Sequence, residues 1–213
     1  MMHGQEFVDW YHRKFVNSYP KSVWPTVYND HRALVHVIEK FDVKTILEIG
    51  TWQGWTALMM WLHPNVEALT TVDIHKDMNI PYDHAIHHLQ DKSFYGEYCK
   101  FTPVKQVFQD SMTLTEDIGH FDMVFVEGNH DYEHCKHDTE LALRIADKVV
   151  AWHDVWNIDT VAQVVGYVPD CYLVAGTLVA YKPMKDKPRQ EIMFGDEKIY
   201  VGIDNQIPIV DKT

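Results

Sequence analysis

TILEIGTWQGWTALMMWL, residues 45–62, is the stretch of sequence that decides the fold. Its first five residues are apolar and β-branched enough for a buried parallel strand, which stops at Gly50. A turn follows and closes at Gly54, and residues 55–62 then continue as an almost wholly apolar segment without glycine or proline, which is typical of a buried helix. Strand, glycine turn and helix form the first unit of a nucleotide-binding α/β fold, in which the ligand lies at the carboxyl end of the strand.

The spacing of this turn restricts the kind of cofactor. It is G-x-x-x-G, because Trp52 stands where the dinucleotide pattern G-x-G-x-x-G has its second glycine. That glycine lets the backbone approach a pyrophosphate, so a diphosphate cofactor such as NAD is disfavoured. A tight strand-to-helix turn that binds no ligand is the alternative that the motif alone leaves open.

Acidic residues follow the next two predicted strands. Residues 66–74 predict a second strand, and Asp73 lies near its end, 23 residues beyond Gly50. Rossmann-like folds place an acid that hydrogen-bonds the ribose hydroxyls at about this distance. A third strand is expected over residues 99–108, and Asp110 after it is either a ligand contact or the N-cap of the next helix.

Carboxylates and imidazoles follow the fourth and fifth predicted strands, residues 121–126 and 148–152. They are Glu127 and His130 after the fourth strand, and His153 and Asp154 after the fifth. Because ligands bind outside the carboxyl ends of the strands in an open α/β sheet, these groups are expected to converge on one edge. Oxygen ligands suit Mg²⁺, and added imidazole shifts the preference toward Mn²⁺ or another transition metal. His130 has an alternative place in the cap of the following helix.

Two motifs resemble known families. The segment EIGTWQG, residues 48–54, resembles the first motif of class I S-adenosylmethionine-dependent methyltransferases, most closely the metal-dependent O-methyltransferases related to the catechol and caffeoyl-coenzyme A enzymes. The segment EGNHDY, residues 127–132, resembles the D-G-x-H-x-Y signature of the cephalosporin-hydroxylase-like and macrolide-sugar O-methyltransferases. The resemblance covers most of residues 45–157. It departs from the families at Glu127, where Asp is usual, and at His153 or Val155, where a second oxygen ligand is expected.

The resemblance implies a role for each matching residue. The residues expected to bind S-adenosylmethionine are Glu48, Gly50, Trp52, Gly54, Asp73 and Asp110, with Glu48 and the glycine turn beside the methionine portion and Asp110 at the adenine amino group. A divalent metal, Mg or Mn, would be held by Glu127, His153 and Asp154. His130 would act as the catalytic base. The acceptor would be a small molecule with a hydroxyl group.

The order of the expected elements predicts an α/β fold with a Rossmann-like, seven-stranded, mostly parallel sheet, helices on both faces and a C-terminal antiparallel hairpin. A single methyltransferase domain, residues 1–213, is expected. Its parts would be an N-terminal helical cap (1–41), a cofactor- and metal-binding core (45–157) and a C-terminal helix and hairpin (158–213).

Some element boundaries are also predicted outside the first strand–turn–helix unit. An amphipathic helix is expected over residues 5–17, followed by an irregular connector and by a second helix that Asn29 or Asp30 would cap. Further helices are expected near residues 82–92 and 159–165, and the last strands near 172–182 and 197–203.

Composition restricts partners and location. The 31 acidic residues against 19 Lys and Arg give a formal net charge of −12. This charge repels a phosphate backbone and therefore disfavours a nucleic-acid substrate. The three cysteines lack C-x-x-C spacing and indicate reduced thiols in a cytoplasmic protein, and neither a signal peptide nor a membrane span is expected. The sequence leaves the acceptor and the oligomeric state open, a homo-oligomer included.

The main hypothesis is therefore a methyltransferase that acts on a small-molecule hydroxyl with the help of a divalent metal. Two alternatives stay open. One is a metal-independent N- or O-methyltransferase in which His130 and His153 act alone, and the other is a non-catalytic module that binds S-adenosylmethionine. An NAD-dependent reductase is disfavoured by Trp52.

Overall fold

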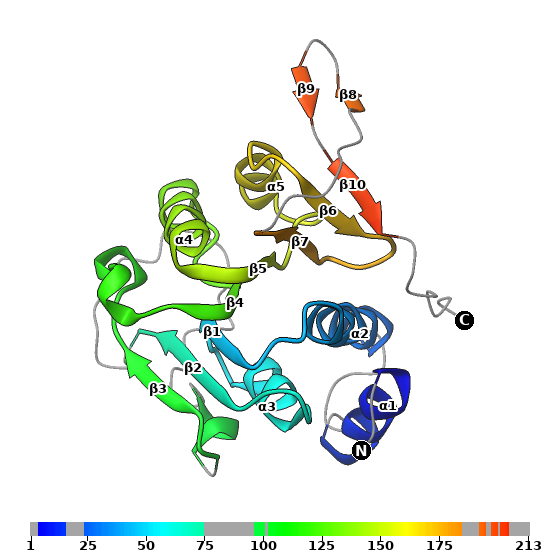
Figure 1. The fold of residues 1–213 in the computed structure, drawn as a ribbon, viewed down its shortest axis with the longest axis vertical. Coiled ribbons are helices and arrows are strands. Elements are labelled where there is room, and N and C mark those ends of the chain that lie inside the picture. Colours follow the sequence, from blue (N-terminus) through cyan, green and yellow to red (C-terminus); the bar gives the residue numbers. More distant parts are fainter. Residues whose placement is uncertain are drawn as a thin grey trace.

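An eight-stranded sheet with the order β10-β6-β7-β5-β4-β1-β2-β3 runs through the protein (Figure 1). The structure is a computed structural model and describes residues 4–15, 24–74, 96–100, 102–184, 192–194, 197–199 and 201–204. Its parallel centre consists of β1 (Thr45–Ile49), β2 (Ala68–Asp73), β3 (Lys105–Phe108), β4 (Phe121–Val126) and β5 (Ala146–Trp152). The strand order reverses between β1 and β4, which is the point where open α/β sheets bind ligands.

The C-terminal strands contain the predicted antiparallel hairpin, but its bounds differ from the prediction. β6 (Cys171–Val174) and β7 (Ala180–Pro183) pair antiparallel, β7 also pairs antiparallel with β5, and β10 (Val201–Asp204) lies parallel beside β6. The segment predicted as one strand over residues 172–182 is thus a hairpin, whose turn contains Gly176 at φ 72°. This hairpin raises the number of strands from the predicted seven to eight. β8 (Ile192–Phe194) and β9 (Glu197–Ile199) form a separate antiparallel pair.

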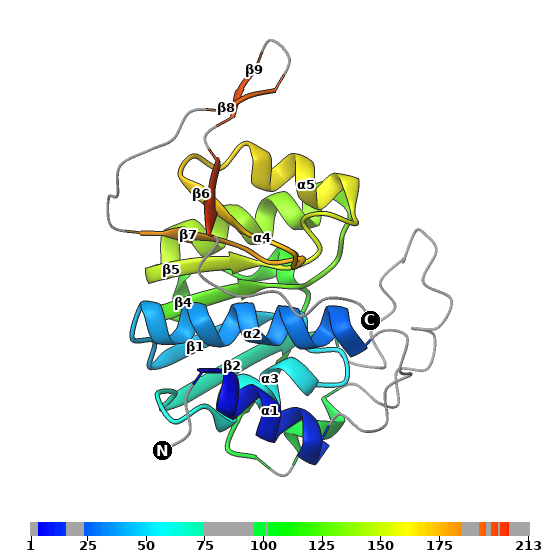
Figure 2. The same cartoon turned by 90° about the vertical axis from the view of Figure 1, so that its right-hand side faces the viewer.

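Helices cover both faces of the sheet, as predicted. α1 (Gly4–Phe15), α2 (Trp24–Lys40) and α3 (Trp55–Leu62) lie on one face, and Figure 2 shows them in front of the strands. α4 (Tyr132–Ile145) and α5 (Asp159–Gly166) lie on the other. Successive residues of β1 alternate between the two layers: Ile46 packs in the apolar cluster of α1 to α3, whereas Leu47 packs in that of α4 and α5.

Two predicted boundaries are wrong. α2 begins at Trp24 and not after Asn29 or Asp30, because Pro25 stands in the first turn, where a missing N–H costs no helical hydrogen bond. The third strand is limited to β3, and the residues before it form the short helix η3 (Glu97–Cys99), which follows Gly96 in the left-handed conformation. The helix expected over residues 82–92 lies outside the described residues.

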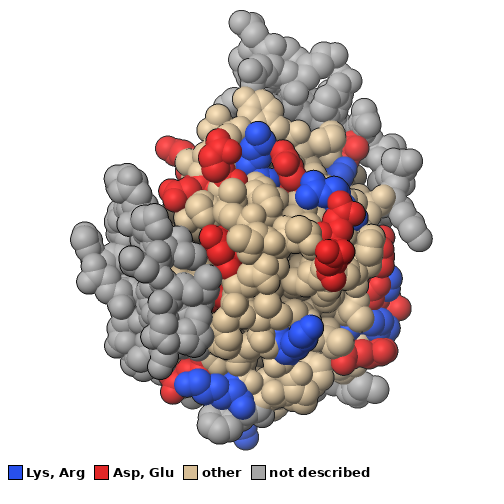
Figure 3. All heavy atoms as spheres, turned by 90° about the vertical axis from the view of Figure 1, so that its left-hand side faces the viewer, with Lys and Arg blue, Asp and Glu red and all other residues tan. Residues whose placement is uncertain are grey.

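Acidic and basic side chains are mixed on the described surface. On the face in Figure 3, Lys and Arg lie interspersed with Asp and Glu, and the described residues there form no continuous basic patch. None of the described helices has both the length and the apolar character required to cross a bilayer. Cys99, Cys135 and Cys171 are free and buried.

Candidate active site

The loops that follow the central parallel strands lie side by side at the carboxyl edge of the sheet. Backbone hydrogen bonds continue the pairing past the strands themselves. The N–H of Glu127 donates to the carbonyl of Ile49 at 2.8 Å, and the N–H of His153 donates to the carbonyl of Val126 at 3.2 Å. The groups that follow β1, β4 and β5 are therefore neighbours, as the strand order requires.

The turn after β1 is held open by unusual backbone conformations and by Asp73. Gly50 and Gly54 have φ 98° and 87°, and Trp52 between them has φ 44°. Asp73, at the end of β2, accepts the backbone N–H groups of Thr51 at 2.9 Å and of Trp52 at 2.7 Å through the same oxygen, Oδ2. Asp73 thus fixes the turn to the neighbouring strand, a contact that the sequence did not predict.

Glu48 lies beneath this turn and not on its surface. Its side chain is buried and accepts the Thr71 hydroxyl at 2.6 Å, and that hydroxyl also contacts the hydroxyl of Thr51. Burial raises the pKa of Glu48 well above its ordinary value, and the nearby charges of Glu127 and Asp73 raise it further. Glu48 is therefore a buried hydrogen-bonding group that supports the turn.

Asp110 follows β3 and has a structural role in addition to any contact with a ligand. It is the N-cap of the short helix η4 (Ser111–Thr113), and its Oδ1 accepts the N–H of Met112 at 3.0 Å. The N-cap alternative for Asp110 is therefore present in the structure. Phe108 and Met112 each lie two residues from Asp110 in the sequence, and both expose apolar surface at this end of the sheet.

Glu127, His153 and Asp154 come together at the ends of β4 and β5. One ligand atom from each lies within 4.8 Å of the others. His153 Nδ1 is 2.9 Å from Glu127 Oε2 and 3.4 Å from Asp154 Oδ1. Glu127 Oε2 and His153 Nδ1 are buried and face each other, and neither makes a well-aligned hydrogen bond within the described residues. A proton on Nδ1 or a cation bound by both atoms would satisfy this buried pair.

The backbone of Asp154 is also unusual. Its φ of 59° places a residue with a side chain in the left-handed region. Such conformations occur at functional sites, where the surrounding structure holds them in place. Here the conformation directs the chain out of β5 while keeping the Asp154 carboxylate beside His153.

The pKa shifts of the triad formed by Glu127, His153 and Asp154 indicate that this cluster favours positive charge. Burial raises the pKa of Glu127, although His153 opposes the rise. Burial would lower the pKa of His153, but the charge of Glu127 and hydrogen bonds to Asp154 and Asp30 outweigh it and raise the pKa well above the ordinary value. Burial would likewise raise the pKa of Asp154, yet hydrogen bonds from His130 and His153 hold it well below the usual range. Protons on the imidazoles or a bound cation can supply this charge.

His130 lies next to the triad. Its Nε2 is 3.2 Å from Asp154 Oδ2, and the Thr160 hydroxyl donates to its backbone carbonyl at 2.6 Å. Burial opposes protonation, but the hydrogen bond to Asp154 and the charges of Asp154 and Glu127 raise the pKa of His130. The N-cap of α4 is Asp131, so the alternative that His130 caps this helix is wrong.

A family match covers the part of the chain that builds this site. The match is to a methyltransferase domain and runs from residue 47 to residue 155, which is just over half of the 213 residues. The chain belongs to this methyltransferase family. No curated protein sequence matches it at a significant level.

Solved structures of methyltransferases share the fold of this family member. PaMTH1 from Podospora anserina, solved with S-adenosylhomocysteine (SAH), has a TM-score of 0.53 and 14% identity over 85% of this chain and 88% of its own. The N-methyltransferase NodS from Bradyrhizobium japonicum, also with SAH, has a TM-score of 0.52 and 14% identity over 83% and 97%. A candidate caffeoyl-CoA O-methyltransferase from Staphylococcus aureus has a TM-score of 0.52 and 15% identity over 83% of this chain and 91% of its own. The predicted class I methyltransferase fold is confirmed.

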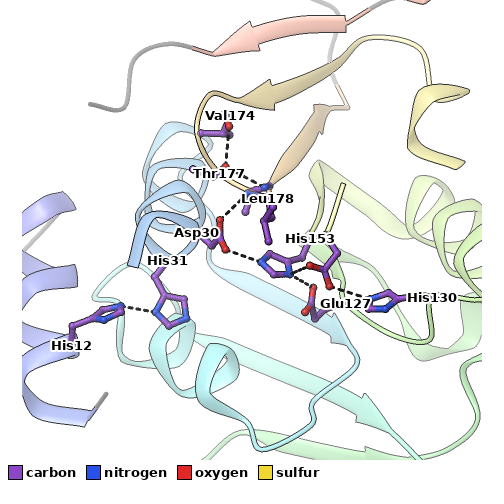
Figure 4. A network of polar contacts seen from close by, with 11 residues as sticks. His12, Asp30, His31, Glu127, His130, His153, Val174, Thr177 and Leu178 are labelled. Atoms are coloured by element: carbon purple, nitrogen blue, oxygen red, sulfur yellow. Dashed lines mark hydrogen bonds and ion pairs between the residues drawn. The ribbon is translucent and has the colours of Figure 1, made fainter. Parts of the chain in front are cut away.

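The methyltransferase site contains one residue that sequence reasoning did not assign to it. Asp30, on α2, accepts the Nε2–H of His153 at 3.0 Å through Oδ2 and the backbone N–H of Leu178 at 2.8 Å through Oδ1 (Figure 4). One signal could have found it. Residues 29–32 are four consecutive polar residues, which together span most of the circumference of a helix, so at least one must face inward. All four are buried.

A pair of buried histidines joins the first two helices of the methyltransferase. His12 Nε2 on α1 lies 2.9 Å from His31 Nδ1 on α2 (Figure 4). Burial lowers the pKa of His12 to about 4, and burial together with the His12 charge lowers that of His31 well below its ordinary value. Both rings are therefore neutral near pH 7, with one donating to the other.

This pair predicts a loss of stability in acid. The unfolded chain protonates His12 below its ordinary pKa of 6.5, whereas the folded protein resists protonation until about pH 4. Stability is therefore full above 6.5 and falls as the pH drops toward 4, by about 2 kcal/mol at pH 5. Urea unfolding at pH 7 and pH 5 measures the loss. His12→Gln should reduce it, while the same change at the exposed His120 should not. Equal losses in all three proteins would contradict the assignment.

Proposed function

We propose that this methyltransferase transfers the methyl group of S-adenosylmethionine to a hydroxyl of a small molecule, assisted by a divalent metal ion. The observation that carries the proposal is the cluster of Glu127, His153 and Asp154, whose ligand atoms lie within 4.8 Å of one another. The proposed cofactor turn follows β1, the neighbour of β4, so donor and metal would share one edge of the sheet.

The three side chains fit a divalent cation chemically. Two carboxylates and one imidazole can hold Mg²⁺, and the nitrogen ligand makes Mn²⁺ the better fit. The buried atoms Glu127 Oε2 and His153 Nδ1, 2.9 Å apart, support the proposal, because each has a lone pair that an ion would accept and neither makes a well-aligned hydrogen bond within the described residues. Glu127 stands where the resembled families have Asp, and its Oε2 lies 2.9 Å from His153 Nδ1.

The cofactor proposal assigns the turn and the strand ends to S-adenosylmethionine. Glu48 would support the turn from below, Asp73 would contact the ribose, and Asp110 the adenine. Gly50, Trp52 and Gly54 would supply the backbone that faces the cofactor. PaMTH1 and NodS, which share the fold, hold SAH, and the exposed Phe108 and Met112 beside Asp110 offer apolar surface for a planar base.

In the proposed reaction a bound ion supplies positive charge that lowers the pKa of the acceptor hydroxyl. His130 takes the proton. Since its Nε2 faces Asp154, Nδ1 is the nitrogen available to accept it. The hydroxyl oxygen then bonds to the methyl carbon while the carbon–sulfur bond breaks, and its electron pair stays on sulfur to give SAH. Asp154 holds the imidazole in position and stabilises the imidazolium that forms.

A metal-independent methyltransferase is the second candidate. The observation that favours it is the His130–Asp154 pair at 3.2 Å, a complete imidazole–carboxylate dyad in which no ion is required. His153, held between Asp30 and Glu127, would then be a charged group of the pocket wall.

One experiment separates the candidates. The purified protein would be analysed for bound metal and for cofactor affinity, and methyl transfer from labelled S-adenosylmethionine would be measured on catechols, flavonoids and sugars. Chelator should abolish transfer, and Mn²⁺ or Mg²⁺ should restore it. Transfer that persists in chelator would support the metal-independent enzyme. Cofactor binding without transfer to any acceptor, with metal added, would support the non-catalytic module.

Asp73→Ala is expected to weaken S-adenosylmethionine binding by about 1–3 kcal/mol, because it removes the proposed ribose partner and frees the Thr51 and Trp52 N–H groups that Asp73 holds. Titration calorimetry measures the change. Asp147→Ala, at the opposite edge of the sheet in an exposed pair with His120, is the matched control and should bind normally. Unchanged affinity in a folded Asp73→Ala protein would remove Asp73 from the cofactor site.

The proposed partners follow from this assignment. The acceptor is a small molecule, and the net charge of −12 disfavours a nucleic acid. A cytoplasmic location stays a prediction, in keeping with three free cysteines.

A further inference from the structure

We infer that Asp30 of α2 is a positioning residue that fixes the ring of His153 with Nδ1 directed at Glu127 and Asp154, which presupposes the metal site proposed above. Asp30 does not belong to that ligand cluster. It contacts the opposite nitrogen of the ring, Nε2, at 3.0 Å. The N-terminal helices would thus take part in metal binding through a side chain that need not touch the ion.

The two ring nitrogens of His153 have different partners. Asp30 Oδ2 lies 3.0 Å from Nε2, and Glu127 Oε2 lies 2.9 Å from Nδ1. A carboxylate only accepts hydrogen bonds, so the contact with Asp30 keeps a proton on Nε2. The lone pair of a neutral ring then belongs to Nδ1, on the side of the ligand cluster. Metal-binding histidines commonly donate their other N–H to a carboxylate in this way, which sets both tautomer and ring orientation.

Asp30 is itself held rigidly. Its side chain is buried, and its second oxygen, Oδ1, accepts the N–H of Leu178 at 2.8 Å. Leu178 lies in the turn between β6 and β7, and its carbonyl accepts the N–H of Val155 at 3.1 Å. Val155 directly follows Asp154. Figure 4 shows Asp30 between Leu178 and His153. The same small network therefore ties α2, the β6–β7 turn and the end of β5 together around the ring.

Asp30→Asn is the substitution that tests this role. It conserves the shape of the side chain but has one acceptor oxygen in place of two. If that oxygen keeps the Leu178 N–H, the amide NH₂ faces His153 Nε2, and the ring must turn or move its proton to Nδ1. The expected result is a 10- to 100-fold weaker affinity for Mn²⁺, with an unchanged affinity for S-adenosylmethionine. Asp147→Asn, in the exposed pair with His120, is the control and should leave both affinities unchanged.

Two measurements on the full-length protein decide the outcome. Calorimetric titration with Mn²⁺ alone gives the affinity, and ¹⁵N-edited NMR of the histidine rings in Mg²⁺ reports which nitrogen of His153 carries hydrogen. Wild type should show a hydrogen-bonded proton on Nε2, and Asp30→Asn should lose this signal. A purely structural role would lower the melting temperature without moving the proton.

The outcomes separate this inference from the metal proposal. Wild-type protein with no proton on Nε2, or a folded Asp30→Asn variant with wild-type Mn²⁺ affinity, would overturn the inference. The wild-type NMR measurement gives this answer even if the variant does not fold. If wild type bound no Mn²⁺ while the Nε2 proton was present and depended on Asp30, the metal proposal would fail and the positioning of His153 by Asp30 would be retained.

Discussion

Gly50→Ala is expected to destabilise the protein by about 3–5 kcal/mol, a large part of the stability of an ordinary domain. Gly50 has φ 98°, which a residue with a side chain rarely adopts. A Cβ at this position would also lie 2.2 Å from the backbone carbonyl oxygen of Glu127. Because both β1 and β4 are central strands, neither backbone can move away without breaking the sheet. Urea unfolding followed by circular dichroism measures the loss.

Gly119→Ala is the matched control for this collision. Gly119 has φ 104°, so the substitution carries similar backbone strain, but no atom of the described residues lies within 4 Å of the added Cβ. It should cost about 1–2 kcal/mol. The difference between the two variants measures the contact with Glu127. Equal losses of unfolding free energy would show that the close approach of the two strand ends does not contribute to the cost of the Gly50 substitution.

The role of Gly50 in the fold limits what its substitution can show about function. A variant that does not fold binds no cofactor, whether or not the turn contacts S-adenosylmethionine. Asp73 is a better probe, since its half-buried carboxylate holds the turn through hydrogen bonds and its loss causes no backbone collision. The pattern that pointed to a ligand site is also required by the tight packing of β1 against β4.

The central sheet could be predicted because its information is local. β1, β4 and β5 each contain a short apolar run, and a polar group follows each of these strands. Parallel strands share one carboxyl edge, so Glu127 and Asp154 could be placed side by side without knowing any side-chain contact. The structure brings both of them and His153 within 4.8 Å of one another. Their use as metal ligands stays a prediction.

The contribution of α2 could not be predicted in the same way. Asn29 and Asp30 have the residue types of helix caps, but the helix starts earlier, at Trp24, with Pro25 in its first turn. The contact of Asp30 with His153 joins residues 123 positions apart in the sequence. The local pattern carries no information about such a pair. The predicted C-terminal hairpin is present, but its turn was not located for a related reason, since Gly176 turns the chain within an apolar run that otherwise resembles one strand.

Asp154→Asn is expected to weaken divalent-metal binding and to lower methyl transfer by about 100-fold or more, while S-adenosylmethionine binding stays nearly unchanged. Asn tolerates the left-handed backbone that Asp154 adopts at φ 59°, so the fold should be kept. The substitution removes one negative ligand and the partner that holds His130 at 3.2 Å. Mn²⁺ titration, cofactor titration and a methyl-transfer assay on the same preparation give the three quantities.

His130→Gln provides the contrast that identifies the cause. It leaves Glu127, His153 and Asp154 in place, so Mn²⁺ affinity should stay near that of wild type while the rate of methyl transfer falls by about 100-fold. A loss of rate with a loss of metal in Asp154→Asn, together with a loss of rate without a loss of metal in His130→Gln, would assign the ligand and the base to different residues. If Asp154→Asn left Mn²⁺ affinity untouched, the metal-dependent mechanism would be abandoned. The His130–Asp154 dyad would then have to account for proton removal without an ion.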